Sequence, residues 1–396
     1  MKESCYRRIE ADIDLDAIRY NIETVKSLNP PKRKTLLVIK ADAYGHGAVV
    51  LAKEMDDLAD YFAVATVDEA LELRGADIVK PILILGYTDE SEYEDIINND
   101  ITIAIYDYQE AERLSEIAEG LGKKAKVHIK ADSGMSRIGF QCDDLGIEEA
   151  YKLTKLKGLD VEGVFTHYAK ADYADKSDAL TQFSAFSKFV KALEDKGVNF
   201  KIRHIDNSAG AMEIHSDGFD MMRLGIVIYG LYPSEEIDKS VVIKPAMSLK
   251  SRVVHVKDLP AGRGVGYGWS YVTEKTTKVA TVSVGYADGY PRALSNKGRV
   301  LIHGQYAPII GRVCMDQIMV DVTDIKDADG QSSDGTVKVG DEVVLFGKQR
   351  ENSISVEEVA EPANSFNYEE VCNISRRVPR VYFRNNEEVY EVNYLK

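Results

Sequence analysis

The sequence predicts an α/β protein in which an N-terminal (β/α)8 TIM barrel is followed by a mostly β domain. In the first 225 residues, eight short apolar runs alternate with longer amphipathic stretches. Eight strand–helix alternations in sequence favour a closed barrel over an open doubly wound sheet. After Gly225 the pattern changes to alternating, β-branched segments separated by turn residues, which is typical of a β-rich domain.

The eight apolar runs are the expected barrel strands. Their continuous apolar character fits parallel strands that are covered on both faces. A sheet of six or seven strands, with one or two runs miscounted, is the alternative. The runs span residues 35–39, 61–65, 81–85, 101–105, 126–129, 160–165, 200–205 and 221–224.

Amphipathic helices are expected between these runs. Residues 15–28 carry Leu15, Ile18, Ile22 and Val25 at helical spacing, and residues 109–119 and 179–193 show similar stripes.

The second domain is expected to hold short strands and two short helices. The predicted domains are residues 1–240 and 241–396, with an N-terminal strand as a candidate member of the second domain. A surface loop is expected at 324–335, and helices at 356–360 and near 369–374. The expected strands are 247–256, 277–284, 299–303, 307–313, 318–322 and 342–346.

Composition excludes several functional classes. The 396 residues include 65 acidic and 50 basic ones, a net charge of −15, which disfavours binding to nucleic acid or to an anionic membrane. No apolar run approaches the roughly 18 residues of a membrane span, and the first residues do not resemble a secretory signal. The four cysteines, Cys5, Cys142, Cys314 and Cys372, are far apart without a CxxC pair. A reduced cytoplasmic protein without a disulfide framework or metal site is therefore expected.

Lys40 stands directly after the first apolar run, where a buried barrel strand ends. Chemistry in such barrels is carried at the carboxyl ends of the strands. Desolvation lowers the pKa of a lysine, which suits a Schiff-base or general-base role. A lysine that reaches from the rim to water is the alternative. The following Tyr44-Gly45-His46-Gly47 favours the functional interpretation, because its glycines allow a tight turn and its tyrosine can donate to a phosphate.

The string from Lys40 to Gly47 closely resembles the pyridoxal 5'-phosphate (PLP) signature of alanine racemases, which are PLP enzymes of fold type III. That family usually has Asn where this chain has Asp42. The resemblance extends through both expected domains. It implies that Lys40 carries PLP covalently and that Tyr44 contacts its phosphate.

Further barrel residues match family positions. The resemblance implies that Arg137 contacts the phenolic oxygen of the cofactor and the substrate carboxylate, although a surface ion pair is the alternative for this residue. It implies that His167 bridges a catalytic tyrosine and an arginine, where a structural hydrogen bond is the alternative. Lys130 and Arg137 place two cations in one region. Since the family sometimes carbamylates the matching lysine, a carbamate on Lys130 is the corresponding hypothesis.

Strands seven and eight are expected to hold the phosphate and the pyridine ring. Small polar residues at a strand-to-helix turn bind anions through hydroxyl and backbone N–H groups. Ser208, Gly225 and Ile226 resemble phosphate ligands, and Asn207 resembles a neighbour of the ring. The resemblance implies that Arg223 faces the pyridine nitrogen. A protonated arginine donates a hydrogen bond there without surrendering its proton, which weakens the ring as an electron sink.

The β domain supplies the remaining matches. Tyr267 resembles the second catalytic residue of the family, although four nearby glycines alone would indicate only a loop. The backbone N–H of Met315 would meet the substrate carboxylate. Asp316 has a supporting position, and Cys314 is expected to be a small buried apolar residue rather than a reactive thiol. Tyr286 resembles a residue that lines the entrance.

Tyr368 resembles a second tyrosine on the phosphate side. Phe366 nearby stands where the family commonly has an aliphatic residue, and we expect it to reshape the pocket edge slightly.

These matches predict an isomerase that interconverts L- and D-alanine by two-base proton transfer. Lys40 would serve the D-side and Tyr267 the L-side. The resemblance also implies a cytoplasmic head-to-tail homodimer with shared active sites that supplies D-alanine for peptidoglycan. Three alternatives remain: a racemase with serine or broader specificity, a PLP-dependent amino-acid decarboxylase, and a non-catalytic PLP-binding barrel protein.

Overall fold

The computed structural model describes residues 6–326 and 337–396. It divides into two compact units, which are described separately. The barrel unit comprises Ala17–Ala43 and Ala48–Lys244. The β unit comprises Met1–Asp16, Tyr44–Gly47 and Pro245–Lys396, except where residues lie outside the described ranges. No helix in the described part of the chain is long and apolar enough to cross a membrane.

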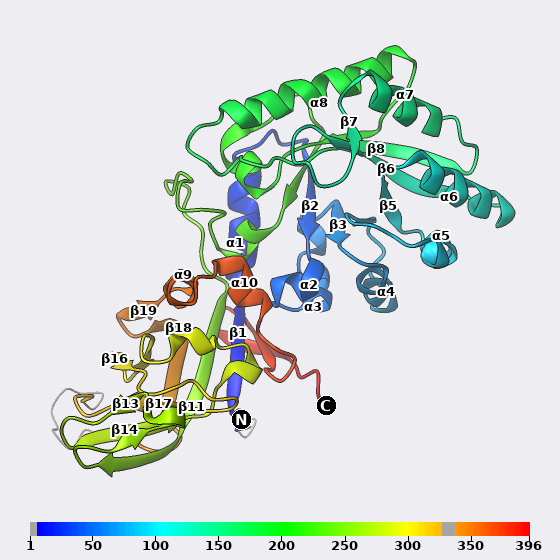
Figure 1. Cartoon of the computed structure of the whole chain (residues 1–396). Coiled ribbons are helices and arrows are strands. Elements are labelled where there is room, and N and C mark those ends of the chain that lie inside the picture. Colours follow the sequence, from blue (N-terminus) through cyan, green and yellow to red (C-terminus); the bar gives the residue numbers. More distant parts are fainter. Residues whose placement is uncertain (1–5, 327–336) are drawn as a thin grey trace. The chain divides into compact units, whose positions relative to one another are not determined.

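The barrel unit contains a closed barrel of eight parallel strands within the described residues (Figure 1). Pairing between β5 and β6 closes the ring, and a short strand β7 (Phe140–Gln141) is added to β6. The predicted fold class and all eight predicted strands are confirmed. In chain order the barrel strands are β2 (Lys34–Val38), β3 (Tyr61–Val64), β4 (Ile82–Ile84), β5 (Thr102–Ile105), β6 (Ala125–Asp132), β8 (Leu159–Phe165), β9 (Ile202–His204) and β10 (Met221–Leu224).

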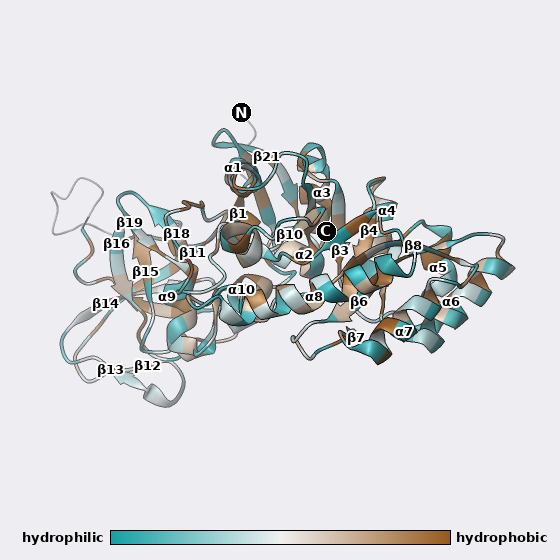
Figure 2. Cartoon of the chain, turned by 90° about the horizontal axis from the view of Figure 1, so that it is seen from above, coloured by the Kyte–Doolittle hydropathy of each residue, from teal (hydrophilic) through white to brown (hydrophobic). Residues whose placement is uncertain are grey.

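The three helices predicted from apolar stripes form as α1 (Leu15–Ser27), α6 (Tyr108–Gly120) and α8 (Ser177–Asp195). Asp107 begins α6 because its carboxylate accepts the N–H groups of Gln109 and Glu110 at 2.7 and 3.0 Å. The helices carry both apolar and polar residues, as Figure 2 shows, which fits one face packed on the strands. The other helices are α3 (Ala48–Glu54), α4 (Val67–Gly75), α5 (Tyr93–Asn98) and α7 (Asp144–Leu153).

The β unit is built on a mixed sheet in which β1 (Ile9–Asp14) is a central strand. It pairs antiparallel with β11 (Met247–Leu259) and parallel with β20 (Arg380–Arg384). The other strands are β12 (Gly264–Val265), β13 (Tyr271–Val272), β14 (Thr277–Val282), β15 (Arg299–Ile302), β16 (Gln305–Pro308), β17 (Ile318–Asp321), β18 (Glu342–Gln349), β19 (Asn352–Ile354) and β21 (Glu387–Val392).

The strand predicted at residues 307–313 differs from the structure. Regular pairing ends at Pro308, Ile309 makes only an isolated bridge to Val320, and Gly311 has a φ of +78°. A left-handed residue turns the chain out of the extended conformation, so the β-branched residues there do not continue the strand.

Helix α9 (Val356–Ala360) matches the prediction, and α10 (Asn367–Cys372) begins two residues before the expected start.

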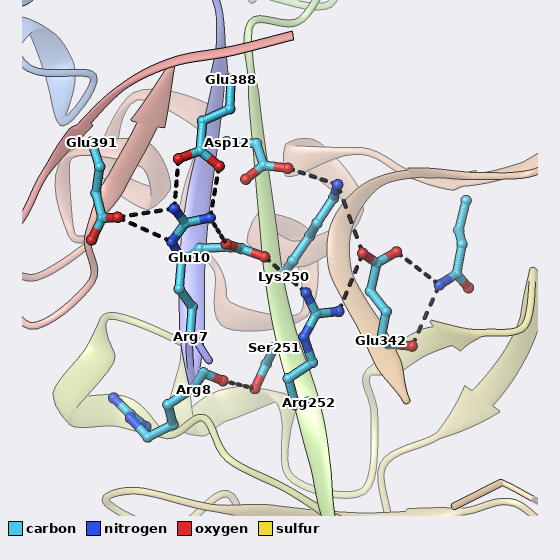
Figure 3. Close-up of polar contacts among 11 residues, drawn as sticks. Arg7, Arg8, Glu10, Asp12, Lys250, Ser251, Arg252, Glu342, Glu388 and Glu391 are labelled. Atoms are coloured by element: carbon cyan, nitrogen blue, oxygen red, sulfur yellow. Dashed lines mark hydrogen bonds and ion pairs between the residues drawn. The ribbon is translucent and has the colours of Figure 1, made fainter. Parts of the chain in front are cut away.

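Ion pairs connect β1, and Arg7 just before it, with other strands of the β unit (Figure 3). Arg7 donates to Glu388 at 2.7 Å and to Glu391 at 2.9 Å, both on β21. Glu10, which is nearly buried, accepts from Arg7 at 3.2 Å and from Arg252 on β11 at 3.1 Å. Shared charges of this kind stabilise more than isolated surface pairs, because one ordered carboxylate serves two cations.

Two sequence expectations fall on residues outside the described ranges. Most of the loop expected at 324–335 lies there, and so does Cys5. Cys142 and Cys314 are free thiols within the described part of the chain.

Candidate active site

Lys40 follows β2 at the carboxyl end of the barrel strand, as predicted. The chain then makes a left-handed turn, labelled α2 (Lys40–Tyr44) in Figure 1, in which residues 41–43 have φ of 51–53°. The N–H of Ala43 donates to the carbonyl of Ile39 at 2.9 Å, and the Asp42 carboxylate accepts the N–H of Ala48 at 2.8 Å. These bonds fix the backbone conformation of the residues that follow Lys40.

The segment Tyr44–Gly47 belongs to the β unit. Arg380 donates to the Gly45 carbonyl at 2.9 Å, and the Tyr382 hydroxyl donates to the His46 carbonyl at 3.0 Å. Gly47 is required here, because a Cβ at its position would lie 1.8 Å from the Tyr382 oxygen. The glycine predicted to allow a tight turn therefore also allows this close approach of the backbone.

The two tyrosines predicted on the phosphate side lie together in the β unit. The ring centroids of Tyr44 and Tyr368 are 6.0 Å apart, and Phe366 lies 5.4 Å from Tyr368. Burial raises the pKa of Tyr44, so its hydroxyl stays protonated at neutral pH and can donate a hydrogen bond.

Lys130 is almost fully buried in the barrel unit, where its Nζ donates to the Ala131 carbonyl at 2.7 Å. Burial and then the nearby Arg223 lower the pKa of Lys130 to about 7, while Asp132 acts in the opposite direction. Arg137, which the sequence analysis placed near Lys130, lowers the pKa of Lys130 less than Arg223 does. Its side chain is exposed in the loop after β6. The lysine amine is therefore partly unprotonated at neutral pH.

Asp132 shapes the loop that carries Arg137. One of its carboxylate oxygens accepts three successive backbone N–H groups, those of Gly134 at 3.0 Å, Met135 at 2.9 Å and Ser136 at 3.0 Å. A carboxylate bound in this way fixes the loop as it leaves the strand.

Arg223 on β10 is buried, and its terminal nitrogens contact protein groups at the carboxyl ends of β8 and β9. Its Nη2 donates to the carbonyls of Thr166 and Ile205, both at 2.8 Å, and contacts His167 Nδ1 at 3.1 Å. Its Nη1 contacts His204 Nδ1 at 3.0 Å. Burial lowers the pKa of Arg223 to about 10, so it remains a cation at neutral pH.

Residues predicted to bind phosphate lie at the ends of β9 and β10. The N–H of Gly225 donates to the Ser208 hydroxyl at 3.0 Å, which brings these two residues together. Ile226 is buried and begins a short 3₁₀ turn, Ile226–Tyr229. Asn207 instead accepts the N–H of Gly210 at 3.0 Å and so also shapes the backbone after β9.

The predicted residues of the β unit are largely exposed within one chain. The exposed fraction is 71% for Tyr267, 52% for Met315 and 43% for Tyr286. Tyr286 and the strip that carries Met315 are joined, because the Tyr286 N–H donates to the Cys314 carbonyl at 3.1 Å. Asp316 pairs with Arg377 at 2.8 Å.

Cys314 is half-buried rather than fully buried, and burial raises the pKa of its thiol. This agrees with an unreactive thiol.

Comparison with known proteins identifies the family. The family model described as alanine racemase, N-terminal domain, matches residues 13–233, and the one described as alanine racemase, C-terminal domain, matches residues 246–382. The chain is 45% identical over 393 residues to the alanine racemase of Clostridium perfringens strain ATCC 13124. The matched region covers 99% of this chain and 99% of that relative. The chain belongs to the alanine racemase family. The predicted family, fold and activity class are thereby confirmed.

Solved structures of alanine racemases agree with the fold. The structure from Clostridium difficile 630 matches with a TM-score of 0.92 at 42% identity, covering 99% of this chain and 100% of that one. The Bacillus anthracis alanine racemase with bound L-Ala-P matches with a TM-score of 0.92 at 36% identity, covering 99% of each. The Bartonella henselae alanine racemase, with covalently bound pyridoxal phosphate, matches at 28% identity with a TM-score of 0.83 and coverage of 96% and 100%.

Side chains of the barrel unit fit the cofactor of alanine racemases. PLP combines an aldehyde, a phosphate and a ring nitrogen that accepts a hydrogen bond. The barrel unit places Lys40 at a strand end, and a buried guanidinium, Arg223, lies on the neighbouring strand β10. It also holds the Ser208 hydroxyl beside Gly225, a suitable anion ligand at the strands that usually bind phosphate in such barrels.

Sequence reasoning missed several polar residues around Arg223. His128, Glu162 and His204 lie inside runs that were interpreted only as apolar strands. A histidine in an otherwise apolar strand is a signal in itself, because a buried polar ring needs a hydrogen-bond partner. The partners could not be predicted, since they come from strands far apart in the sequence.

Proposed function

We propose that this chain interconverts L- and D-alanine with PLP bound covalently to Lys40. The observation that carries the proposal is the position of Lys40 at the carboxyl end of β2, followed by a fixed left-handed turn, beside the strand that holds Arg223. The covalently bound PLP of the Bartonella relative and the bound L-Ala-P of the Bacillus relative support it. When bound, PLP supplies an electron-withdrawing ring that stabilises negative charge at the substrate Cα.

Two bases on opposite faces of Cα would move the proton. The Lys40 amine removes or returns it on the D-side, and the Tyr267 hydroxyl does so on the L-side. A tyrosine needs help to act as a base near neutral pH. His167 supplies it, because Arg223 donates to His167 Nδ1 and the ring then carries its proton on Nε2. That N–H can donate to the Tyr267 oxygen and stabilise its phenolate.

Arg223 and Arg137 would orient the cofactor. Because Arg223 keeps its proton at neutral pH, it donates a hydrogen bond to the pyridine nitrogen rather than transferring a proton to it. This limits the withdrawal of negative charge from the substrate Cα into the ring. Side reactions such as transamination are limited as a consequence. Arg137 would contact the phenolic oxygen and the substrate carboxylate, and Ser208, Tyr44 and Tyr368 the phosphate.

A homodimer would complete the site. The exposure of Tyr267 and Met315 within one chain supports their contribution to the barrel of a neighbouring copy, in a head-to-tail arrangement. We place this enzyme in the cytoplasm, supplying D-alanine for peptidoglycan.

The test is a chirality-resolved assay of the purified protein with L-alanine, with L-serine in parallel. D-alanine should form, and the protein should show the yellow absorbance of lysine-bound PLP, bleached by borohydride. Lys40→Ala should abolish both. A preference for serine, or release of carbon dioxide, would refute the assignment in favour of one of its alternatives, and a colourless wild-type protein would refute PLP binding.

A further inference from the structure

A line of buried polar side chains crosses the barrel interior from Arg223 to a carboxylate. Arg223 Nη1 lies 3.0 Å from His204 Nδ1, and His204 Nε2 lies 2.9 Å from His128 Nδ1. His128 Nε2 then faces Glu162 Oε2 at 3.8 Å, which is an electrostatic contact rather than a hydrogen bond. The Tyr61 hydroxyl donates to the same Glu162 oxygen at 3.0 Å.

The line runs from one end of the barrel to the other. Tyr61 is the first residue of β3, whereas His204 is the last residue of β9. Glu162 therefore lies toward the amino ends of the strands, away from the carboxyl ends where Lys40 stands. Five different strands of one unit contribute, so the arrangement belongs to the barrel itself.

Donor and acceptor roles along the line follow from chemistry. A guanidinium has no acceptor, so His204 Nδ1 must accept from Arg223 and the His204 proton must lie on Nε2. That N–H donates to His128 Nδ1, so the His128 proton also lies on Nε2. The His128 N–H then points at Glu162. Every dipole in the line is thus directed from the cation to the carboxylate.

Both rings are neutral and only the ends are charged. Burial lowers the pKa of His128 and, further, that of His204. The facing His128 ring is the main cause that lowers the pKa of Glu162 to about 2, and so Glu162 is ionised at neutral pH. Lys201, whose Nζ is 3.7 Å from the other carboxylate oxygen, is a further cation at this end.

The packing of the barrel is fitted to these two rings. His128 pairs with Gly163 on β8, and a Cβ on Gly163 would lie 2.8 Å from two atoms of the imidazole. Phe165 stacks on His204 with centroids 4.8 Å apart and an angle of 9° between the planes. A larger residue at either contact would displace a ring and break the line.

We propose that Glu162 is a positioning residue for Arg223, acting across the barrel through the Nε2–H tautomers of His128 and His204. Arg223 sets the direction of the hydrogen bonds, and the carboxylate stabilises the far end of the line electrostatically by facing His128. Together they hold the guanidinium plane and its charge where the cofactor nitrogen is expected. The expected effect on catalysis rests on the proposed function, whereas the expected histidine tautomers are independent of it.

The tautomers are tested by NMR of the full-length purified protein with ¹⁵N-labelled histidine rings. Long-range ¹H–¹⁵N correlations should show both rings as neutral Nε2–H forms at pH 7, with assignment from His128→Gln and His204→Gln. A proton on Nδ1, or an imidazolium form, in either ring would overturn the proposal.

The positioning role is tested with Glu162→Gln, against Glu148→Gln as the control on the exposed side of α7. The turnover number kcat for alanine should fall by about tenfold, with KM nearly unchanged. A loss of this size is typical of residues that orient a functional group without contacting the substrate. The ¹⁵N signal of PLP labelled at the ring nitrogen should also shift. Activity and signal equal to the wild type would refute the role.

Gly163→Ala keeps every polar group but displaces the His128 ring. It should reproduce the loss in kcat and disturb the His128 signals, whereas Gly120→Ala, whose Cβ meets nothing within 4 Å, should do neither. A Gly163→Ala protein with wild-type kcat and intact tautomers would count against the line. If the expected tautomers are present but no PLP binds, the line stands and the proposed function fails.

Discussion

The left-handed turn after Lys40 should store strain that a single glycine can relieve. Ala41 has φ 51° and ψ 50°, and its side chain is exposed, so Ala41→Gly removes little buried surface. A non-glycine residue in this conformation costs about 1–2 kcal/mol. Glycine avoids this cost but loses about 0.5–1 kcal/mol more chain entropy on folding. We therefore expect Ala41→Gly to raise the free energy of unfolding by about 0.5–1 kcal/mol.

The same substitution in a right-handed helix supplies the control. Ala192 lies within α8, in the same unit, and is half-buried. Glycine relieves no strain there and costs about 1 kcal/mol. The two variants should therefore shift stability in opposite directions, which separates the backbone effect from any general effect of glycine.

Equilibrium urea unfolding, followed by circular dichroism at several protein concentrations, measures both shifts. Racemase activity is assayed alongside, and it should fall for Ala41→Gly because a glycine next to Lys40 lets the lysine backbone move. The reasoning about strain would be refuted if Ala41→Gly lowered the unfolding midpoint by as much as Ala192→Gly does.

Three other predictions concern the site. Tyr267→Phe should lower alanine racemisation about 10²–10⁴-fold while PLP absorbance is retained; comparable activity would overturn the two-base assignment. Lys130, with its pKa lowered to about 7, should form a carbamate more readily as pH rises from 6 to 8, seen as a ¹³C signal after addition of labelled bicarbonate and absent in Lys130→Ala. A lysine that stays an unmodified ammonium would exclude it. The pKa of Glu162 is lowered from 4.5 to about 2, so its contribution to stability is present above pH 4.5 and lost as pH falls toward 2. Glu162→Gln should therefore show a smaller loss of stability than the wild type over this range in urea unfolding; an equal loss would show that Glu162 is not stabilised by folding.

The barrel strands were predictable because a strand that is buried on both faces appears in the sequence as a continuous apolar run. The run at 221–224 and strand β10 coincide, and the run at 61–65 differs from β3 by one residue. The ends of β9 were less clear, since the apolar run at 200–205 includes residues that flank the paired segment Ile202–His204. Pairing geometry rather than hydropathy decides where such a strand begins.

Much of the site could be located by motif but its internal contacts could not. Lys40, Ser208 and Arg223 stand at strand ends, where barrel topology brings chemistry together. The contacts of Arg223 with His167 and His204 join residues 56 and 19 positions apart, and no local pattern predicts them. Glu162 was overlooked for the same reason, because a single acidic residue in a strand does not reveal its partner.

The central position of β1 has a consequence for the order of events during synthesis. This strand is translated before its partners β11 and β20, which follow roughly 230 and 370 residues later. At about 5–20 residues per second, β1 waits at least about 10 s with both edges unpaired, while the barrel can already close. The nascent segment is a target for chaperones during that interval, and moving it by circular permutation to follow β21 should speed assembly of the β unit.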